Sequence, residues 1–324
     1  MSRVTEALSR WQQTVTAAQE EAHRVGHAEV DLDHLVVALA AIGGPAGESL
    51  RAAGVSLDEA RRAAARVHAD RLAGAGVSVT PTPPRALDVL PTPALPLSAR
   101  ADRALRQVGE LSADDRSVLR TLVDEPSGLV AEMLAALDVT PDAVRAAADA
   151  WRPAPAPGGR LHADDPAGRP WRTLACDGWV PAAPERVWAL LVDPARRTGW
   201  DTWYSSVAEQ PDGSLLCVLR SEEDGGKGVP ADMRRQLLTV VARDEGRLVE
   251  WEVARPDRDG GAAFQRLAVA LSPSGDGTRL DVTVRWLPRH GWRRLVGWVL
   301  RPVGRWMYRQ MVLQKIGGIS RALR

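Results

Sequence analysis

Three histidines near the end of the first expected helix are the residues that most directly suggest chemistry. His23 and His27 lie four residues apart, on one face of a helix, where they could hold a metal ion, and His34 follows seven residues later. The glutamate of a zinc-protease His-Glu-x-x-His motif is missing, because Arg24 stands at its position. We therefore interpret the histidines as structural hydrogen-bonding groups and expect neither a metal nor a cofactor.

The second half of the chain has carboxylates without a recognisable catalytic arrangement. Asp201, Glu250 and Glu252 could act in acid–base chemistry. No Ser-His-Asp order or paired-carboxylate motif accompanies them, and His290 is the only histidine beyond residue 172. No phosphate-binding Gly-x-x-x-x-Gly-Lys-Ser/Thr motif occurs, since the sequence at 225–228 lacks both the spacing and the hydroxyl. We predict no ATPase and assign no catalytic residue, and an enzymatic role stays open as an alternative.

Basic residues dominate the last stretch of the chain. Between Arg289 and Arg324 nine residues are basic and none is acidic, with Trp292, Trp298 and Trp306 interleaved. Such a helix can lie on an anionic membrane or bind an anionic ligand, or it can be a core helix whose arginines face solvent. The residues that would make a membrane or anion contact are Arg293, Arg294, Arg301, Arg305 and Arg309.

Helical periodicity fills the first part of the chain. Asp31 can cap a helix at 32–41, and Ser56 with Glu59 forms a capping box for a helix from Leu57 to about Leu72. Residues 54–61 match residues 138–145, so we predict an internal repeat of helical units. The apolar stripe of the first helix consists of Leu8, Trp11, Val15, Ala18, Ala22 and Val25.

Beyond residue 172 the apolar period changes to two, which is typical of strands. We predict a helix at 184–191 and a long final helix from about Trp292, kinked at Pro302. One antiparallel sheet with a terminal helix is an α+β pattern. The predicted strands lie near 173–180, 214–220, 235–243, 247–254, 263–272 and 278–287.

Two proline-rich stretches mark the predicted domain boundaries. The predicted divisions are a helical domain at 1–151 with repeats at about 5–75 and 97–151 joined by a linker at 76–96, then a linker at 152–171 and an α+β domain at 172–324.

Overall composition sets further limits. The net charge is +1, so no general attraction to nucleic acid is expected. The two cysteines, Cys176 and Cys217, lie in apolar runs and are interpreted as reduced core residues. The first residues lack the apolar core of a signal peptide, and no apolar run reaches the roughly 18–20 residues that span a membrane. We expect a cytoplasmic protein without a transmembrane segment.

A set of short motifs in the first block resembles the Clp N-terminal repeat domain. The residues that carry the resemblance are Ala18-Gln19-Glu20-Glu21-Ala22, Gly26-His27, Val30-Asp31-Leu32-Asp33-His34-Leu35 and Gly54-Val55-Ser56-Leu57-Asp58. The second block fits through residues 129–144 and lacks the Gly-His pair. The resemblance implies a pair of four-helix repeats that docks substrates and adaptor proteins.

The same resemblance implies two protein-contact residues, Asp33 and His34. Some members of the family recognise arginine-phosphorylated proteins through an acidic position beside the histidine. Asp33 occupies that position in the first repeat, whereas Arg116 occupies it in the second, which departs from the pattern.

The third block resembles the START-related superfamily of polyketide cyclase-like and lipid-transport proteins. The resemblance is carried by Val180-Pro181-Ala182-Ala183-Pro184-Glu185-Arg186-Val187-Trp188, by Val192-Asp193-Pro194 and by Trp200. It implies a helix-grip fold, in which a sheet wraps round the last helix and leaves a largely apolar cavity. Members bind lipids, polyketides, hormones or other hydrophobic molecules, and only some are enzymes.

Strand alternation and the resemblance together give the expected cavity wall. Whether Phe264 or Gln265, and whether Arg235 or Gln236, faces inward depends on a register that the sequence does not fix. The predicted cavity residues are Trp188, Trp200, Val249, Trp251, Val253, Leu267, Val269, Val282, Val284, Trp286 and Trp298.

These observations favour a non-ATPase binding or adaptor protein. The helix-grip domain would bind a hydrophobic small molecule or lipid, and the Clp-type repeat would contact a protein, such as a Clp ATPase, an adaptor or a substrate. The alternatives are a polyketide cyclase or aromatase-like enzyme and a protein that binds anionic membrane surfaces through its basic last helix.

Overall fold

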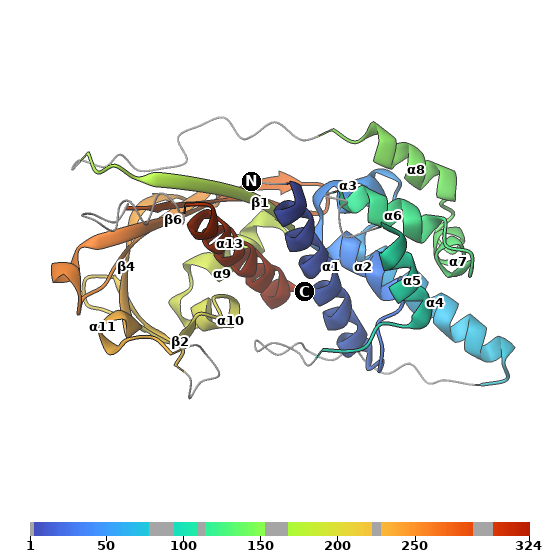
Figure 1. The fold of residues 1–324 in the computed structure, drawn as a ribbon, viewed down its shortest axis with the longest axis horizontal. Coiled ribbons are helices and arrows are strands. Elements are labelled where there is room, and N and C mark those ends of the chain that lie inside the picture. The colour runs from blue at the N-terminus through green and yellow to red at the C-terminus, as the bar shows by residue number, and fades with distance from the viewer. Residues whose placement is uncertain (1–2, 78–93, 109–113, 153–167, 222–227, 288–300) are drawn as a thin grey trace. The chain divides into compact units, whose positions relative to one another are not determined.

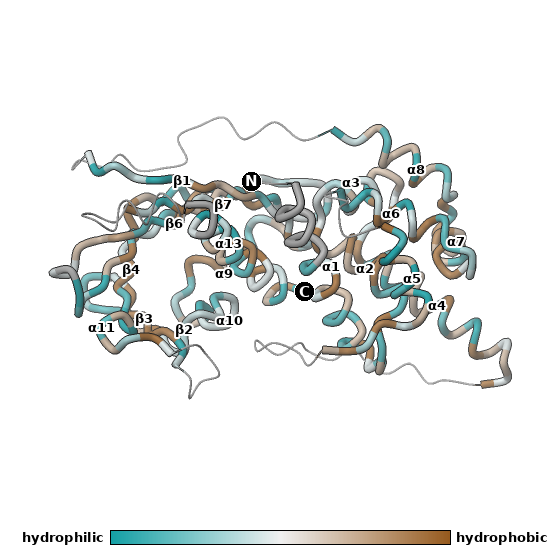
Figure 2. Tube along the Cα trace, in the orientation of Figure 1, coloured by the Kyte–Doolittle hydropathy of each residue, from teal (hydrophilic) through white to brown (hydrophobic). Residues whose placement is uncertain are grey.

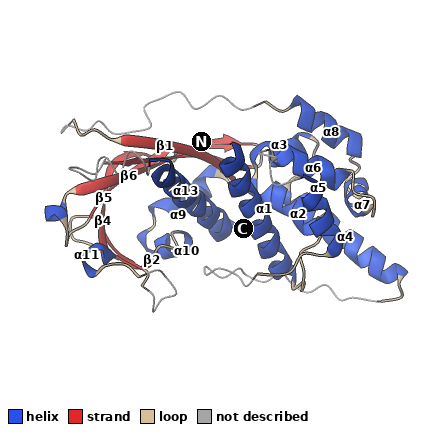
Figure 3. Ribbon diagram, in the orientation of Figure 1, coloured by secondary structure: helices blue, strands red, loops and turns tan. Residues whose placement is uncertain are grey.

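A computed structural model describes residues 3–77, 94–108, 114–152, 168–221, 228–287 and 301–324, and of residues 3–11, 259 and 301–303 it describes the backbone alone. The chain forms two compact units, Met1–Ala156 and Pro157–Arg324. Among the described residues, named strands occur only in the second unit (Figure 3). The chain is therefore an all-α unit followed by an α+β unit, which is the predicted fold class.

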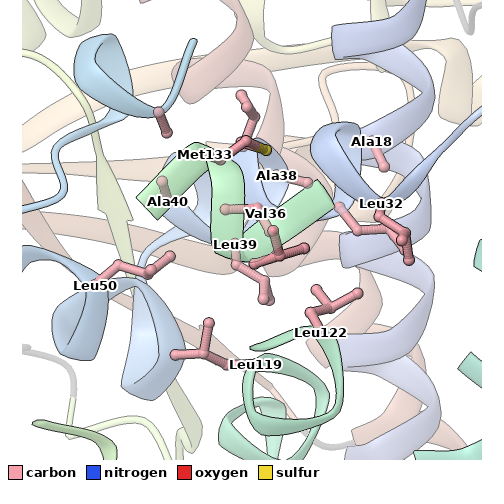
Figure 4. Close-up of a cluster of buried hydrophobic side chains, with 14 of the residues drawn as sticks. Ala18, Leu32, Val36, Ala38, Leu39, Ala40, Leu50, Leu119, Leu122 and Met133 are labelled. Atoms are coloured by element: carbon pink, nitrogen blue, oxygen red, sulfur yellow. The ribbon is translucent and has the colours of Figure 1, made fainter. Parts of the chain in front are cut away.

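The first unit is built of helices around one central helix. Its described helices are α1 Arg3–Val25, α2 Leu32–Ile42, α3 Gly44–Ala52, α4 Leu57–Gly74, α5 Ala99–Val108, α6 Asp115–Val123, α7 Leu129–Ala135 and α8 Pro141–Ala150. α2 contacts α1, α3, α4, α6 and α7, and its apolar sequence LDHLVVALAAI suits a helix buried on all sides. Figure 4 shows Leu39 of α2 in one apolar cluster with Leu50 and Leu119.

Side-chain caps begin two helices of the first repeat, α2 and α4. The Leu32 N–H donates to Asp31 at 2.9 Å, and the Asp31 N–H donates to Nδ1 of His34 at 2.9 Å. The Ser56 N–H donates to Oε2 of Glu59 at 2.8 Å, and the Glu59 N–H donates back to Oγ of Ser56 at 3.3 Å. Both predicted caps are confirmed, and His34 acts as the reciprocal partner of Asp31.

The second repeat has the same four-helix order in shorter form. Thr140 accepts the Ala143 N–H at 3.2 Å, and Pro141 opens α8, as the sequence predicted.

One predicted detail of the first repeat is wrong: Val25 is 46% exposed and does not continue the buried stripe. The reason is that α1 ends at Val25, and Gly26, with a φ of 77°, turns the chain away.

The second unit contains a seven-stranded antiparallel sheet in the order β1-β7-β6-β5-β4-β3-β2. The strands are β1 Arg172–Val180, β2 Tyr204–Glu209, β3 Leu215–Leu219, β4 Arg235–Asp244, β5 Leu248–Ala254, β6 Ala263–Ser274 and β7 Gly277–Trp286. Six of them lie where the alternation predicted strands. β2 was not predicted, because this end strand, YSSVAE, contains too few apolar residues to alternate visibly.

Helices line the concave side of this sheet (Figure 1). They are α9 Pro184–Val192, α10 Arg197–Trp200 and α13 Arg301–Leu323. Three short elements lie in connections between the others: η1 Pro194–Arg196, α11 Ala231–Arg234 and η2 Asp259–Gly261. α13 contacts β1, β7, α9 and α10. Figure 2 shows apolar residues along β3 and β4, so the sheet is apolar at this end as well.

The final helix is anchored through its second half. Val312, Ile316, Ile319 and Leu323 recur at spacings of three and four residues, and all are buried. The predicted helix from Trp292 onward lies outside the described residues as far as residue 300, and Pro302 lies in the first turn of α13.

No single described helix is long and apolar enough to cross a membrane; α2 and α3, which meet at a 96° bend, would pass that test only as a pair.

Candidate functional site

The concave face of the sheet presents an apolar wall toward α13. Of the predicted cavity residues, those on β5, β6 and β7 are buried in one cluster with Val312 and Ile316 of α13. Trp286 is half-buried and stacks on Tyr308, with ring centroids 4.1 Å apart. The buried strand residues are Val249, Trp251, Val253, Leu267, Val269, Val282 and Val284. Trp298 lies outside the described residues.

The strand register settles which polar residues join this wall. Gln265 pairs with Val253 across β5 and β6 and is buried, so it shares the inner face with that residue. Gln236 accepts a hydrogen bond from the Tyr204 hydroxyl at 2.9 Å. Arg235, in contrast, is exposed and forms an ion pair with Asp257.

Three buried ionisable side chains meet beside this apolar wall. Arg197 and Asp201 belong to α10 and the residue that follows it, and Lys315 comes from the middle of α13. Arg197 and Asp201 are 1% and 0% exposed. Nζ of Lys315 lies 2.5 Å from Oδ2 of Asp201, whereas Nη2 of Arg197 lies 3.7 Å from the same oxygen. With Lys315 protonated, two cations therefore face one carboxylate in the interior of the unit.

Several polar atoms of this cluster have no hydrogen-bond partner among the described residues. They are Nε and Nη1 of Arg197, Nε1 of Trp200 and Oδ1 of Asp201. The guanidinium carbon of Arg197 lies 4.7 Å from the ring centroid of Trp200 and 4.4 Å from that of Trp251. Indole rings stabilise the cation but do not accept its N–H bonds in the guanidinium plane. Buried polar groups usually have partners, so these four atoms are exceptions among the described residues.

A glycine of α13 allows the close approach that forms the cluster. A Cβ built on Gly318 would lie 2.0 Å from the carbonyl oxygen of Trp200. Only a residue without a side chain can occupy this position while α13 packs on α10. Gly318 follows Lys315 by one helical turn, so this contact brings Nζ of Lys315 within reach of Asp201.

Burial shifts the pKa values of groups in and around the cluster. Desolvation lowers the pKa of Lys315; the charge of Asp201 opposes this effect, and Arg197 adds to it. Burial raises the pKa of Tyr204 well above its usual range, with a further contribution from Asp201. Burial also raises the pKa of the Cys217 thiol to about 11, so this thiol is not a reactive thiolate at neutral pH.

The other carboxylates considered for acid–base chemistry lie on the opposite face of β5 from Trp251. Glu250 is paired with Arg285, and Oε2 of Glu252 accepts from Nε of Arg266 at 2.8 Å. Such ion pairs engage both carboxylates. Of the three candidates, only Asp201 faces the concave interior.

Trp188 occupies a different place from the other predicted cavity residues. It lies on α9, is 7% exposed, and its indole N–H donates to Oε1 of Glu245 at 2.7 Å. Its ring packs in the common core, while its polar end points toward the β4–β5 turn.

The basic residues of the last helix do not form one solvent-exposed row. Lys315, which was not among the arginines expected to contact a membrane or an anion, is buried in the cluster. Arg305 is exposed and Arg309 is partly buried. Arg293 and Arg294 lie outside the described residues, as does the side chain of Arg301.

The helical unit has a pocket of about 370 Å³ at the start of α2. Charged and histidine side chains supply much of its lining. The lining residues are Gly26, His27, Ala28, Glu29, Asp31, Asp33, His34, Ala64, His68, Arg71, Arg100 and Leu129. Asp33 and His34, the predicted protein-contact residues, are both buried in its wall, so a partner would reach them only by inserting a side chain.

Hydrogen bonds order the histidines of this pocket. Nδ1 of His34 accepts the Asp31 N–H, which leaves Nε2 of His34 to donate to Nδ1 of His27 at 2.9 Å. Burial, with the neighbouring His34, lowers the pKa of His27. Ligand atoms of His27, Asp33 and His34 lie within 4.8 Å of one another and are the only described group with metal-ligand spacing, but the hydrogen bonds already use both His34 nitrogens.

The two repeats differ at this position. Counted from the helix N-cap, Arg116 of α6 stands where Asp33 stands in α2. The Arg116 guanidinium pairs with the cap residue Asp114 at 2.5 Å and lies 5.1 Å from the ring centroid of Trp151. The acidic side chain at this position of the first repeat is therefore replaced in the second by an arginine that forms an internal ion pair.

Residues 8–115 match the sequence profile of the family described as the Clp repeat (R) N-terminal domain. This segment covers α1 to α5 and reaches the first residue of α6. Among curated proteins, none matches the chain.

Solved structures with similar folds include three bacterial proteins. TTHA0849 from Thermus thermophilus is 18% identical, with a TM-score of 0.36 over 47% of this chain and 97% of that one. Ms6760 from Mycobacterium smegmatis is 17% identical, with a TM-score of 0.33 over 46% of this chain and 88% of its own. A START superfamily protein from Mycobacterium smegmatis is 14% identical, with a TM-score of 0.32 over 47% and 96% of the two chains.

Arg197 and Lys315 were not identified as site residues from the sequence. Two signals were available. Arg197 and Asp201 are four residues apart around an apolar tryptophan, and Lys315 interrupts the apolar stripe of α13. Neither signal reveals that Lys315 contacts Asp201, because these two residues lie 114 positions apart in the sequence.

Proposed function

We propose that this chain is a non-ATPase binding protein with adaptor character. Its helix-grip unit takes up a small hydrophobic molecule, and its Clp-type unit docks a protein partner. The observation that carries the first half is the group of buried polar atoms, incompletely hydrogen-bonded within the described residues, beside an apolar wall. Ligand sites commonly combine apolar walls with a few convergent polar groups.

Native mass spectrometry of the full chain purified from its host tests the small-molecule half. We expect an adduct of small-molecule mass that solvent extraction removes, and we expect the extracted protein to bind the neutral apolar dye Nile red. Only the unliganded mass, together with no dye binding, would contradict this half of the proposal.

A pair of valine substitutions locates the site. Val253→Trp adds bulk at a residue that is 4% exposed on the inner face and should abolish dye binding. Val240→Trp, on the neighbouring strand at a residue that is 43% exposed, is the matched control and should leave binding unchanged. Circular dichroism identifies variants that do not fold. Equal dye binding by both folded variants would place the ligand elsewhere.

The docking half rests on the pocket at the start of α2 and on the match of residues 8–115 to a domain family that binds proteins. A pocket that contains both carboxylates and guanidinium groups suits a polar peptide side chain rather than an apolar one. The Clp protease machinery is the partner we propose, through its ATPase, an adaptor or a substrate.

Pull-down with the purified Clp ATPase of the host, with and without its adaptors and substrates, tests this half. Glu29→Lys reverses an exposed charge that lines the pocket and should weaken retention. Asp70→Lys makes the same change at an exposed α4 residue outside the pocket lining and is the matched control. The adaptor role fails if the unmodified chain retains none of these proteins, and the pocket fails as its site if both variants behave alike.

A further inference from the structure

The buried cluster of Arg197, Asp201 and Lys315 has an electrostatic imbalance. Lys315 occupies Oδ2 of Asp201 at 2.5 Å, whereas Arg197 approaches the same oxygen only to 3.7 Å, beyond hydrogen-bond distance. The single carboxylate therefore bonds directly to one of the two cations. A desolvated and incompletely paired charge destabilises a fold by several kcal/mol in general, so such a group is normally retained for a reason.

The chemistry of the free donors defines what would bind there. Nε and Nη1 of Arg197 and Nε1 of Trp200 are N–H donors without an acceptor among the described residues, and the residues that carry them are both 1% exposed. Three N–H donors, two of them on a guanidinium, suit an acceptor that carries a single negative charge. A carboxylate meets this requirement and matches the planar guanidinium fork. A phosphate dianion would exceed the available positive charge.

The surroundings define the rest of the ligand. Trp251 and Trp200 flank the guanidinium, and buried aliphatic side chains of β5, β6 and β7 extend the inner face away from the cluster. A molecule whose charged group reaches Arg197 would therefore place its remaining atoms against apolar side chains.

We propose that Arg197, with Trp200 and Lys315, forms a buried site for the carboxylate of an otherwise apolar ligand. Arg197 donates through its planar edge, and the Trp200 indole N–H adds a donor. Lys315 takes the direct hydrogen bond to Asp201, which leaves Arg197 at 3.7 Å from that carboxylate with unused N–H donors. The inference rests on the proposed small-molecule function and specifies its ligand class.

Competition against Nile red, with the full chain, separates the proposed carboxylate site from the proposed small-molecule function. The probes are decanoate and decanol, which share a chain length and differ in the head group. We expect decanoate to displace the dye at a concentration at least about 10-fold lower than decanol requires. The reason is that a hydrogen bond to a charged group contributes about 1.5–3 kcal/mol. Equal potency of the two probes would overturn the carboxylate site and leave the proposed small-molecule function intact. No binding of the dye or of either probe would overturn both claims.

Substitution of the arginine assigns the preference to a residue. Arg197→Met should remove the advantage of decanoate over decanol in the same competition. Arg186→Met, at an exposed residue of α9, is the matched control and should leave that advantage unchanged. If Arg197→Met does not fold, Arg197→Lys keeps the charge but loses the planar fork, and it should reduce the advantage of decanoate. A folded Arg197 variant that retains the full advantage would overturn the assignment.

Discussion

Two aspartates, the half-buried Asp31 in the first unit and the buried Asp201 in the second, are bonded in contrasting ways. Asp31 in the helical unit accepts hydrogen bonds from the Leu32 N–H, from Oγ of Ser98 at 2.7 Å and from the Arg100 guanidinium. Asp201 in the helix-grip unit accepts from Lys315 through Oδ2, while its Oδ1 has no hydrogen-bond partner among the described residues.

The difference indicates two uses of a carboxylate. Asp31 ties α2 to the first residues of the second repeat, and its hydrogen-bonding capacity is used within the fold. Asp201 restrains one cation of a cluster whose other cation keeps free donors. A satisfied network rigidifies a fold, whereas an unsatisfied buried group costs stability, and the proposed ligand would supply the missing acceptor.

The largest effect is expected from Asp201→Asn. Removing this charge leaves Arg197 and Lys315 buried without a counter-ion, which should lower the free energy of unfolding of the helix-grip unit by about 3–5 kcal/mol. Urea denaturation followed by tryptophan fluorescence measures it. Asp177→Asn, at a side chain that is 65% exposed on β1, is the control. A loss as small as that of the control would mean that the cluster is not held by Asp201.

Gly318→Ala should have the next largest effect. The added methyl group would meet the Trp200 carbonyl oxygen at 2.0 Å, so α13 must move away from α10 at a cost of about 1–3 kcal/mol. Gly317→Ala is the matched control, because a Cβ there has no described neighbour within 4 Å and should stabilise the helix by up to about 1 kcal/mol. Thermal unfolding measures the change in stability of the two variants. A change of the same sign in both would contradict the close contact at Gly318.

Asp31→Ala tests the satisfied carboxylate. Loss of the cap should destabilise the helical unit by about 1–2 kcal/mol at neutral pH. Burial by itself would raise the pKa of Asp31, but hydrogen bonds from Arg100, Ser98 and the Leu32 N–H outweigh it and lower the pKa. The stabilisation is therefore present above the ordinary Asp pKa of about 3.9 and is lost as the pH falls through the lower folded pKa.

Chemical denaturation at neutral and acid pH measures the difference between the original chain and this variant. Asp58→Ala, which removes a 79% exposed carboxylate from the first turn of α4, is the control. If the stability difference between the original chain and Asp31→Ala stays the same below both the folded and the ordinary pKa of Asp31, the charge of Asp31 is not its source.

The smallest effect is expected from His27→Gln, and it should be visible only as a change in pH dependence. Burial, assisted by His34, lowers the pKa of His27, so its stability contribution is present above the ordinary pKa of about 6.5 and is lost as the pH falls through the folded pKa. The variant should flatten this acid slope in thermal unfolding. His23→Gln, at a histidine that is not among the causes of this shift, is the control, and an acid slope that His27→Gln leaves unchanged would contradict the prediction.

Local features were the most predictable from the sequence. The caps at Asp31, Ser56 and Thr140 were found because capping depends on residues within a few positions of one another. Six strands were found because their side chains alternate between the core and the opposite face. β2 was missed because an end strand with small polar residues has no such alternation.

The sequence by itself determined the helical repeat, the change to strands and the apolar character of the inner sheet face, because these follow from periodicities of two and of three to four residues. It did not determine which charges are buried together. Lys315 and Asp201 lie 114 positions apart in the chain, and only the packing of α13 on α10 at Gly318 brings them together. Burial then removes water from these groups, and loss of hydration is a property of the assembled core rather than of any residue type.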